Sequence, residues 1–341
     1  MQGLSKFNTR LAALSLAGIL AWSCGPQAPL QMHDYHGGAL GTSYAITVFT
    51  TGQEDLAPAI DSVFAVVNHS LSTYQQDSDI SRINNGDSTV VVDALFREVF
   101  EASDRIFHAT NGYFDPTVGV LVDAWGFGPG AALEMDSTVV DSLLRYVGFE
   151  KLKLGADNRL QKSLPAIRLD FNAIAKGYAI DCLGRMLEAR GIDHYLVEVG
   201  GEVRTRGDQP EKKRAWHVGI DDPQATEGRA IKRIVALQDV SMASSGNYRK
   251  FRVDSETGEK FVHTVDPHTG FTRNSNVLAT SVIAPDCTTA DGYATAFMAM
   301  DLEASQALLA DNPDLEGYIV YLNEQGETEE FATPGFEALF R

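Results

Sequence analysis

The sequence has few cysteines and no motif of the kind that binds structural zinc. Cys24, Cys182 and Cys287 are the only three in 341 residues, and no CxxC pair or histidine-rich cluster accompanies them. Structural zinc sites need closely spaced cysteine and histidine ligands, so none is expected. Cys182 and Cys287 could pair in an oxidising compartment, although neither local sequence requires a disulfide.

Basic residues are also scarce. The chain has 28 Lys and Arg against 46 Asp and Glu, which gives a formal net charge of −18. An acidic surface repels a phosphate backbone, so nucleic acid is not expected as a partner. A local basic or metal-bearing pocket could still hold a small anionic ligand.

Long apolar runs are missing. The N-terminal run Leu11–Leu20 is shorter than a membrane-spanning helix. Two basic residues precede it, and a small residue followed by Cys24 ends it, a pattern typical of a bacterial lipoprotein signal. We expect residues 1–23 to be removed, Cys24 to carry a lipid and residues 24–36 to form a tether. An ordinary signal peptide or a signal anchor is the alternative.

A strand, a turn and a helix are predicted together between residues 167 and 191. Alternating apolar residues over 167–171 indicate a short strand, and apolar residues at helical spacing indicate a helix that stops at Gly191. Asp170 and Lys176 flank the turn. Because the first N–H groups of a helix lack partners, this turn could hold phosphate oxygens. A βα unit with solvated charges is the alternative.

A later helix, within residues 286–300, carries two oxygen ligands. Asp291 and Thr295 are four residues apart, so they lie on one helix face. Mg²⁺ prefers a few carboxylates with neutral oxygens, and phosphate oxygens can complete its shell. A favourable charge near the helix start is the alternative explanation of Asp291. Thr288 or Thr289 is expected to cap this helix.

Two segments place aromatic residues among polar ones. Residues 71–85 are predicted to form an exposed loop, and Tyr74 in such a loop is more often a packing residue than a catalytic one. Tyr113 and Phe114 precede Asp115, where a short helix is expected to begin. The two rings could form a hydrophobic staple or a wall for a planar ligand.

The remaining pattern predicts the architecture. We expect paired strands at 151–160 and 166–171, a hydrogen-bonding turn at 244–247 and sharp turns within 263–270. Helices and strands alternate irregularly, with hairpin-like pairs between helices, which predicts an α+β fold with sheets covered by helices. No linker divides the chain, so a single domain is expected over 37–341.

The order of the motifs is more specific than any one of them. A Gly-Thr pair near residue 41 is followed by LSTYQQDSDISRIN, GYFDPTVGVLVDAWGFG, LDFNAIAKGYAID, VEVGGEV, SSGNY, HTVDPHTG and TTADGYATAFM. From about Tyr35 to Phe340, the chain therefore resembles the ApbE family of FAD:protein FMN transferases. The resemblance implies antiparallel or mixed sheets covered by helices, in two intertwined subdomains.

The resemblance also implies a reaction. Such an enzyme binds FAD and Mg²⁺, cleaves the pyrophosphate, and places FMN on a Thr or Ser hydroxyl of an acceptor protein while AMP leaves. Acceptors of this kind are subunits of membrane redox complexes or exported reductases. Members are often periplasmic lipoproteins, which agrees with a lipid on Cys24. A Mg²⁺-dependent FAD pyrophosphatase and a non-catalytic FAD-binding lipoprotein are the alternatives.

Site residues follow from the matched motifs. The resemblance implies that Mg²⁺ binds the backbone carbonyl of Ala173 together with Asp291 and Thr295. His263 is the candidate for proton transfer near the acceptor hydroxyl. The positions expected to contact FAD are Leu40, Tyr74, Tyr113, Phe114, Asp115, Asp170, Lys176 and Val265.

Two positions depart from the usual family pattern. His268 stands where Arg is common in the DPxTG turn, and a neutral imidazole lacks the charged fork of a guanidinium. Ala294 stands where some members have a second acidic residue. We therefore expect this helix to give the metal one carboxylate, with waters or FAD oxygens filling its shell.

Overall fold

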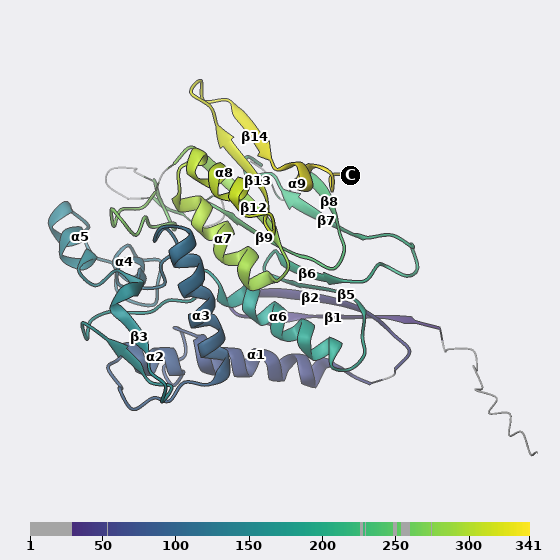
Figure 1. Ribbon diagram of the computed structural model, residues 1–341, viewed down its shortest axis with the longest axis horizontal. Coiled ribbons are helices and arrows are strands. Elements are labelled where there is room, and N and C mark those ends of the chain that lie inside the picture. The colour runs from purple at the N-terminus through teal and green to yellow at the C-terminus, as the bar shows by residue number, and fades with distance from the viewer. Residues whose placement is uncertain are drawn as a thin grey trace, which may run out of the picture.

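The computed structural model describes residues 29–52, 54–225, 228, 230–247, 251–253, 260–273 and 275–341. Its centre is an eight-stranded sheet in which neighbouring strands are antiparallel (Figure 1). In spatial order the strands are β1 (Gln31–Ala39), β2 (Thr42–Thr50), β5 (His194–Val199), β6 (Glu202–Arg206), β9 (Ser241–Gly246), β12 (Val277–Ala284), β13 (Glu316–Leu322) and β14 (Thr328–Ala332).

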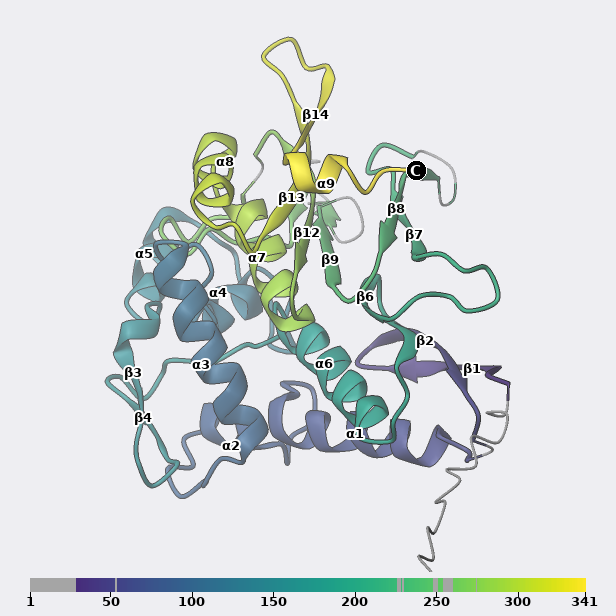
Figure 2. The ribbon, with the colours of Figure 1, turned by 45° about the vertical axis from the view of Figure 1, so that its right-hand side comes forward.

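Helices cover one face of this sheet. α6 (Ala175–Glu188) packs against β5 and β6, and α7 (Cys287–Ala299) packs against β9 and β12 and beside α6 (Figure 2). The other described helices are α1 (Ala57–Leu71), α2 (Asp79–Asn84), α3 (Ala94–Ala109), α4 (Gly119–Ala124), α5 (Ser137–Leu144), the 3₁₀ turn η1 (Phe149–Lys151), α8 (Leu302–Asp311) and α9 (Pro334–Glu337).

Three short hairpins complete the described part of the chain. They are β3 (Leu152–Leu154) with β4 (Leu160–Lys162), β7 (Trp216–Asp221) with β8 (Ile231–Leu237), and β10 (Phe251–Val253) with β11 (Lys260–Val262). The β7–β8 hairpin and α9 pack on the sheet face opposite α7, where Phe336 stacks on Tyr318 of β13 at 5.6 Å between ring centroids. Both faces of the central strands are therefore buried.

The main core lies between the sheet and the helices. Alternating residues of β2 enter it, so that Ile46 and Val48 are fully buried. α7 is buried on nearly all sides, because the sheet, α3 and α6 surround it. The chain leaves the sheet after β2, builds α1 to α6, and returns at β5. This excursion brings several of the motif segments to the start of α6.

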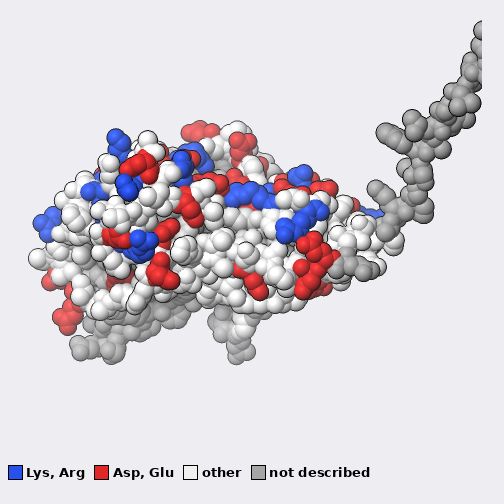
Figure 3. Space-filling view, turned by 90° about the horizontal axis from the view of Figure 1, so that it is seen from below, with Lys and Arg blue, Asp and Glu red and all other residues white. Residues whose placement is uncertain are grey.

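The predicted α+β fold, with an antiparallel sheet covered by helices, is confirmed. The helix expected before Gly191 is present as α6, and the helix expected within 286–300 is present as α7. No helix in the described ranges is long and apolar enough to cross a membrane. The signal segment and Cys24 lie outside the described residues. On the face displayed in Figure 3, basic side chains lie among acidic ones and do not gather in one patch.

Several boundary predictions were wrong. Residues 31–36, assigned to the tether, belong to β1 and pair with β2. Residues 166–171 do not form the hairpin partner; β4 does, and the 167–171 stretch makes only an isolated parallel bridge between Arg168 and Val118. Alternation alone could not distinguish a strand from an extended segment held by other contacts.

Local turns also differed. The polar stretch 71–85 contains α2, which Ser78 caps by accepting a hydrogen bond from the Ser81 N–H. Residues 244–246 continue β9, because Ser244 and Ser245 pair with β12. Asp286 caps α7 in place of either threonine, accepting from the Thr289 N–H at 2.7 Å.

Candidate functional site

Gly177 allows α6 and α7 to approach each other closely. A Cβ atom at this position would lie 2.2 Å from the carbonyl oxygen of Cys287 and 2.8 Å from the Cβ of Asp291. The Gly177 N–H donates to Oδ2 of Asp291 at 3.0 Å. Any other side chain would have to move α7, so Gly177 sets the position of the Asp291 carboxylate.

Three predicted metal ligands come together at this junction. The hydroxyl of Thr295 lies 3.5 Å from the carbonyl oxygen of Ala173, in the turn before α6, and 3.4 Å from the Ser245 hydroxyl of β9. Asp291, one helical turn earlier on α7, is 2% exposed. Its burial raises the pKa of the carboxyl group, and the nearby charge of Lys176 opposes that effect.

Lys176 lies between two buried carboxylates. Its Nζ is 2.7 Å from Oε1 of Glu202 and 3.8 Å from Oδ1 of Asp291. Desolvation lowers the pKa of Lys176, but Asp291 and Glu202 together outweigh it and raise the net value, so the amine is charged. With both carboxylates ionised, the three groups would carry a net charge of −1, which favours a cation nearby.

The donor set at this junction suits Mg²⁺. In the part of the chain that the structure describes, no group of three or more His, Cys, Asp or Glu residues could hold a metal by itself. A carbonyl, a hydroxyl and a single carboxylate are hard oxygen donors that leave coordination positions open for phosphate. Residues Ala173, Asp291 and Thr295 therefore fit the ion that the sequence suggested.

Asp181 of α6 fixes the start of α7 from outside that helix. Its carboxylate accepts hydrogen bonds from the N–H groups of Cys287 and Thr288, at 3.0 and 2.8 Å, and from the Thr288 hydroxyl at 2.6 Å. Arg204 of β6 pairs with the same carboxylate at 2.7 Å. A negative charge at a helix N-terminus is favourable, so this contact stabilises the orientation of α7.

The predicted Tyr74 and Asp170 lie on a second side of the same turn. Asn172 donates from its backbone N–H to Oδ1 of Asp170 at 2.7 Å, and its side chain reaches Thr73 at 3.5 Å. Burial raises the pKa of Asp170. Tyr74 is 63% exposed; partial desolvation, followed by the charges of Asp170 and Asp123, raises its pKa. An exposed ring beside this turn is available to a ligand.

Asn84 joins the segment 71–85 to the same turn. Its side-chain amide exchanges two hydrogen bonds of 2.8 Å with the backbone of Leu169. The N–H of Asp170 donates to the carbonyl of Pro116 at 2.7 Å. Three motif segments that are distant in the sequence therefore meet at the start of α6.

The residues around Tyr113 have different surroundings. The Tyr113 ring lies 4.4 Å from the His268 ring, whereas Phe114 is buried in the main core. Asp115 is also buried, and its Oδ1 accepts from the N–H and the hydroxyl of Thr117 at 2.7 and 2.6 Å. Burial raises the pKa of Asp115 to about 6. The expected helix begins only at Gly119, and contacts of these three residues with FAD stay predictions.

The remaining predicted residues occupy two loops. Leu40 sits at the β1–β2 turn with φ 52, followed by Gly41 with φ 74, and packs partly against the main core. Val265 is buried in a small cluster with Leu121 and Trp125 of the α4 region, so its backbone is the part left for a ligand. His263 is half-buried two residues earlier.

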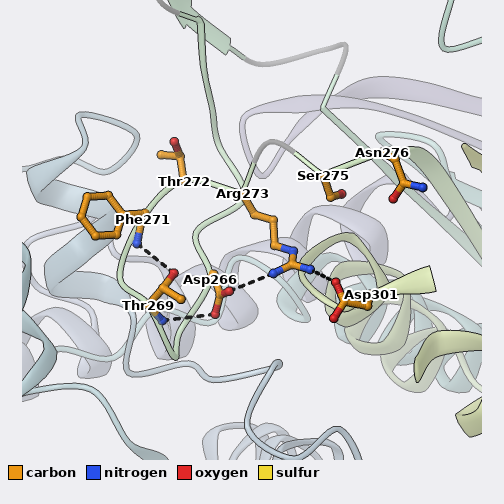
Figure 4. Close-up of a pocket in the computed structure, with 8 residues that line it drawn as sticks. All are labelled: Asp266, Thr269, Phe271, Thr272, Arg273, Ser275, Asn276 and Asp301. Carbon is orange, nitrogen blue, oxygen red and sulfur yellow. Dashed lines mark hydrogen bonds and ion pairs between the residues drawn. The ribbon is translucent and has the colours of Figure 1, made fainter. Parts of the chain in front are cut away.

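A cavity of about 410 Å³ adjoins the HTVDPHTG turn (Figure 4). Arg273 crosses it, with Nη1 3.1 Å from Oδ2 of Asp266 and Nη2 hydrogen-bonded to Asp301. His268 points elsewhere: its Nε2 donates to the carbonyl of Asn111 at 2.9 Å. The guanidinium beside this turn is therefore supplied by Arg273.

Sequence reasoning missed four residues of this region. Three of them, Gly177, Asp181 and Glu202, lie within motifs that the sequence singled out, but only the folded chain shows their contacts. The fourth, Arg273, lies just after the HTVDPHTG motif. The paired glycines before Glu202 were the available signal. Gly200 and Gly201 have φ values of 65 and 109, which only glycine adopts readily, and they turn β5 directly into β6.

Known proteins share both the sequence and the fold. The ApbE family model matches residues 40–319. The FAD:protein FMN transferase of Haemophilus influenzae is 31% identical over 336 residues, 95% of either chain. That of Vibrio cholerae is 32% identical over 307 residues, 88% of this chain and 90% of its own.

Solved structures give the same result. Flavin transferase ApbE from Vibrio cholerae has a TM-score of 0.81 at 31% identity, covering 91% of this chain and all of its own. The apo flavinyl transferase ApbE of Pseudomonas stutzeri has a TM-score of 0.80 at 29% identity, covering 92% of this chain and 98% of its own. With the family model spanning most of its length, this chain belongs to the ApbE family.

Proposed function

We propose that this protein transfers FMN from FAD to a Thr or Ser hydroxyl of an acceptor protein, with Mg²⁺ bound, and releases AMP. One observation carries the proposal: where α6 and α7 join, the Thr295 hydroxyl lies 3.5 Å from the Ala173 carbonyl oxygen, and Asp291, one helical turn before Thr295, accepts from the Gly177 N–H. The names of the related enzymes support the same reaction.

Each group at the junction has a task in this reaction. When bound, Mg²⁺ would supply positive charge to offset the negative charge of the pyrophosphate. Ala173, Asp291 and Thr295 would hold that ion. Lys176 would add a positive charge near the phosphates. Phosphoryl transfer depends mainly on positioning and charge neutralisation, which rigidly packed helices provide.

The acceptor hydroxyl also has to lose its proton. Its oxygen attacks the phosphorus of the FMN half, the P–O bond to AMP breaks, and the hydroxyl proton leaves with a base. His263 is the residue we assign to this proton transfer. General-base help of this kind typically contributes about 10²–10⁴ in rate.

A mass measurement tests the reaction. Mature protein, FAD, Mg²⁺ and a candidate acceptor domain are incubated, and the acceptor is weighed by mass spectrometry. A gain of one FMN with release of AMP is expected, and an acceptor without its target hydroxyl serves as control. AMP release without any mass gain would instead favour the FAD pyrophosphatase. FAD that stays bound and intact would favour the non-catalytic lipoprotein.

The cellular location of the protein is also part of the proposal. The apolar run before Cys24 supports export, lipid attachment at that cysteine and a position facing the periplasm. There the acceptor would be a subunit of a membrane redox complex or an exported reductase. Replacing Cys24 with serine is expected to move the protein from the membrane fraction to the soluble fraction. Unchanged fractionation would exclude lipid on Cys24 as the anchor.

A further inference from the structure

Glu202 contacts Lys176 more closely than Asp291 does. The amine of Lys176 is 2.7 Å from Oε1 of Glu202 and 3.8 Å from Oδ1 of Asp291. The side chains of Glu202 and Asp291 are 4% and 3% exposed, whereas that of Lys176 is 29% exposed. Water therefore screens the two carboxylates little, and the position of the amine decides how much charge Asp291 presents.

Lys176 and a metal ion compete for the same carboxylate. Oδ2 of Asp291 already accepts from the N–H of Gly177, and Oδ1 is the oxygen that faces Lys176. An ammonium group in full contact with Oδ1 would neutralise Asp291 and repel a cation. At 3.8 Å, its contact with Asp291 is the looser of its two ion pairs, and the closer one, at 2.7 Å, is with Glu202.

The backbone fixes Glu202 in this position. It is the first residue of β6, immediately after the Gly200–Gly201 turn. Its Oε2 is buried, and no hydrogen-bond partner for that atom is found among the described residues. Since a buried carboxylate oxygen without a partner is costly, its retention here points to a purpose other than stability.

We infer that Glu202 is a positioning residue that holds Lys176 away from Asp291 and so keeps Asp291 available to a divalent cation. The inference rests on the proposed magnesium site at Ala173, Asp291 and Thr295. It assigns Glu202 no contact with substrate. Its effect on the metal passes through Lys176.

A double-mutant cycle tests this role. Wild-type protein, Glu202→Gln, Lys176→Met and the double variant are titrated with Mn²⁺, and the free ion is measured by electron paramagnetic resonance without FAD. Loss of the Glu202 charge by itself would weaken binding equally in both backgrounds. We expect Glu202→Gln to weaken Mn²⁺ binding about tenfold more in the background with Lys176 than in the Lys176→Met background. This is the effect expected when the Lys176 ammonium moves about 1 Å closer to the Asp291 carboxylate at an effective dielectric constant of about 20.

Each outcome separates the hypotheses. Equal effects of Glu202→Gln in the two backgrounds would refute the positioning role while leaving the metal site intact. Failure of the wild-type protein to bind Mn²⁺ would refute the proposed metal site and this inference together. Thermal melting checks that the variants fold. If Glu202→Gln does not, Glu202→Asp, which keeps the charge but is one methylene shorter, replaces it in the same cycle and is expected to show a coupling of the same sign but smaller, because the retained charge still attracts the amine.

Discussion

The packing of α6 against α7 can be tested by adding one methyl group. In Gly177→Ala, the new Cβ would lie 2.2 Å from the Cys287 carbonyl oxygen, more than 1 Å inside an ordinary contact of about 3.5 Å. The clash is with the backbone of α7, which has no rotamer by which to move away. Helix α7 must shift, and Asp291 shifts with it.

Two opposing effects set the size of the change. Overpacking of a core typically costs about 1–3 kcal/mol, and a backbone clash places Gly177→Ala at the upper end. Alanine in place of glycine within a helix returns about 1 kcal/mol. We therefore expect a net loss of about 2 kcal/mol, or roughly 4 °C in the melting temperature at about 2 °C per kcal/mol for a large domain.

Gly292 provides a matched control on α7 itself. It is also a buried helical glycine, but the nearest atom to its added Cβ would be the Cδ1 tip of Ile106, at 2.5 Å, and the next nearest atoms, at 3.7 Å, are at ordinary contact distance. That tip can rotate away, so Gly292→Ala is expected to change stability by less than about 1 kcal/mol.

Urea unfolding and Mn²⁺ titration measure both variants. Gly177→Ala is expected to lose stability and metal affinity together, because Asp291 moves relative to Ala173. Stability within about 0.5 kcal/mol of wild type, with unchanged metal affinity, would show that the α6–α7 contact does not determine the site.

Three further predictions follow from the same geometry. Asp181→Ala should lower the free energy of unfolding in urea by about 3 kcal/mol, because it removes the buried carboxylate that pairs with Arg204 and with the start of α7. Asp141→Ala, at an exposed position of α5, is the control and should change it very little. Burial raises the pKa of Asp115 to about 6, so its carboxyl group stabilises the fold most when protonated. As the pH rises from 4 to 7, the free energy of unfolding of the wild type should fall by up to about 3 kcal/mol relative to that of Asp115→Asn. Parallel pH profiles of the two proteins would contradict this. Thr295→Val should reduce Mg²⁺-dependent AMP release while Thr295→Ser retains it, and equal activity of the two variants would remove the hydroxyl from the metal site.

Local sequence determined the elements that have a single buried face. The helix α3 and the strand β2 were predictable because their apolar residues recur at 3.6 and 2 residues, and each element buries one side. Helix α7 has only a weak apolar periodicity, since it is buried nearly all round. Its existence was still predictable from its length and composition, but not the cap at Asp286.

The candidate metal ligands could be predicted only in part. The spacing of Asp291 and Thr295 placed both side chains on one helix face, and the ordered motifs identified the family. The contribution of Ala173 is a backbone carbonyl, which carries no side-chain signal. Its position 3.5 Å from the Thr295 hydroxyl depends on how the turn before α6 folds onto α7.

Only the tertiary structure decided which charges meet. Asp181 accepts hydrogen bonds from the first N–H groups of a helix that begins 106 residues later, and Glu202 pairs with the lysine of a different element. Spacing along the chain predicts contacts within one helix or one hairpin, whereas these contacts require α6, α7 and β6 to be packed together. The sequence by itself thus determined the elements with one buried face, the motif order and the family, and the close approach at Gly177 decided how Asp291, Lys176 and Glu202 share their charge.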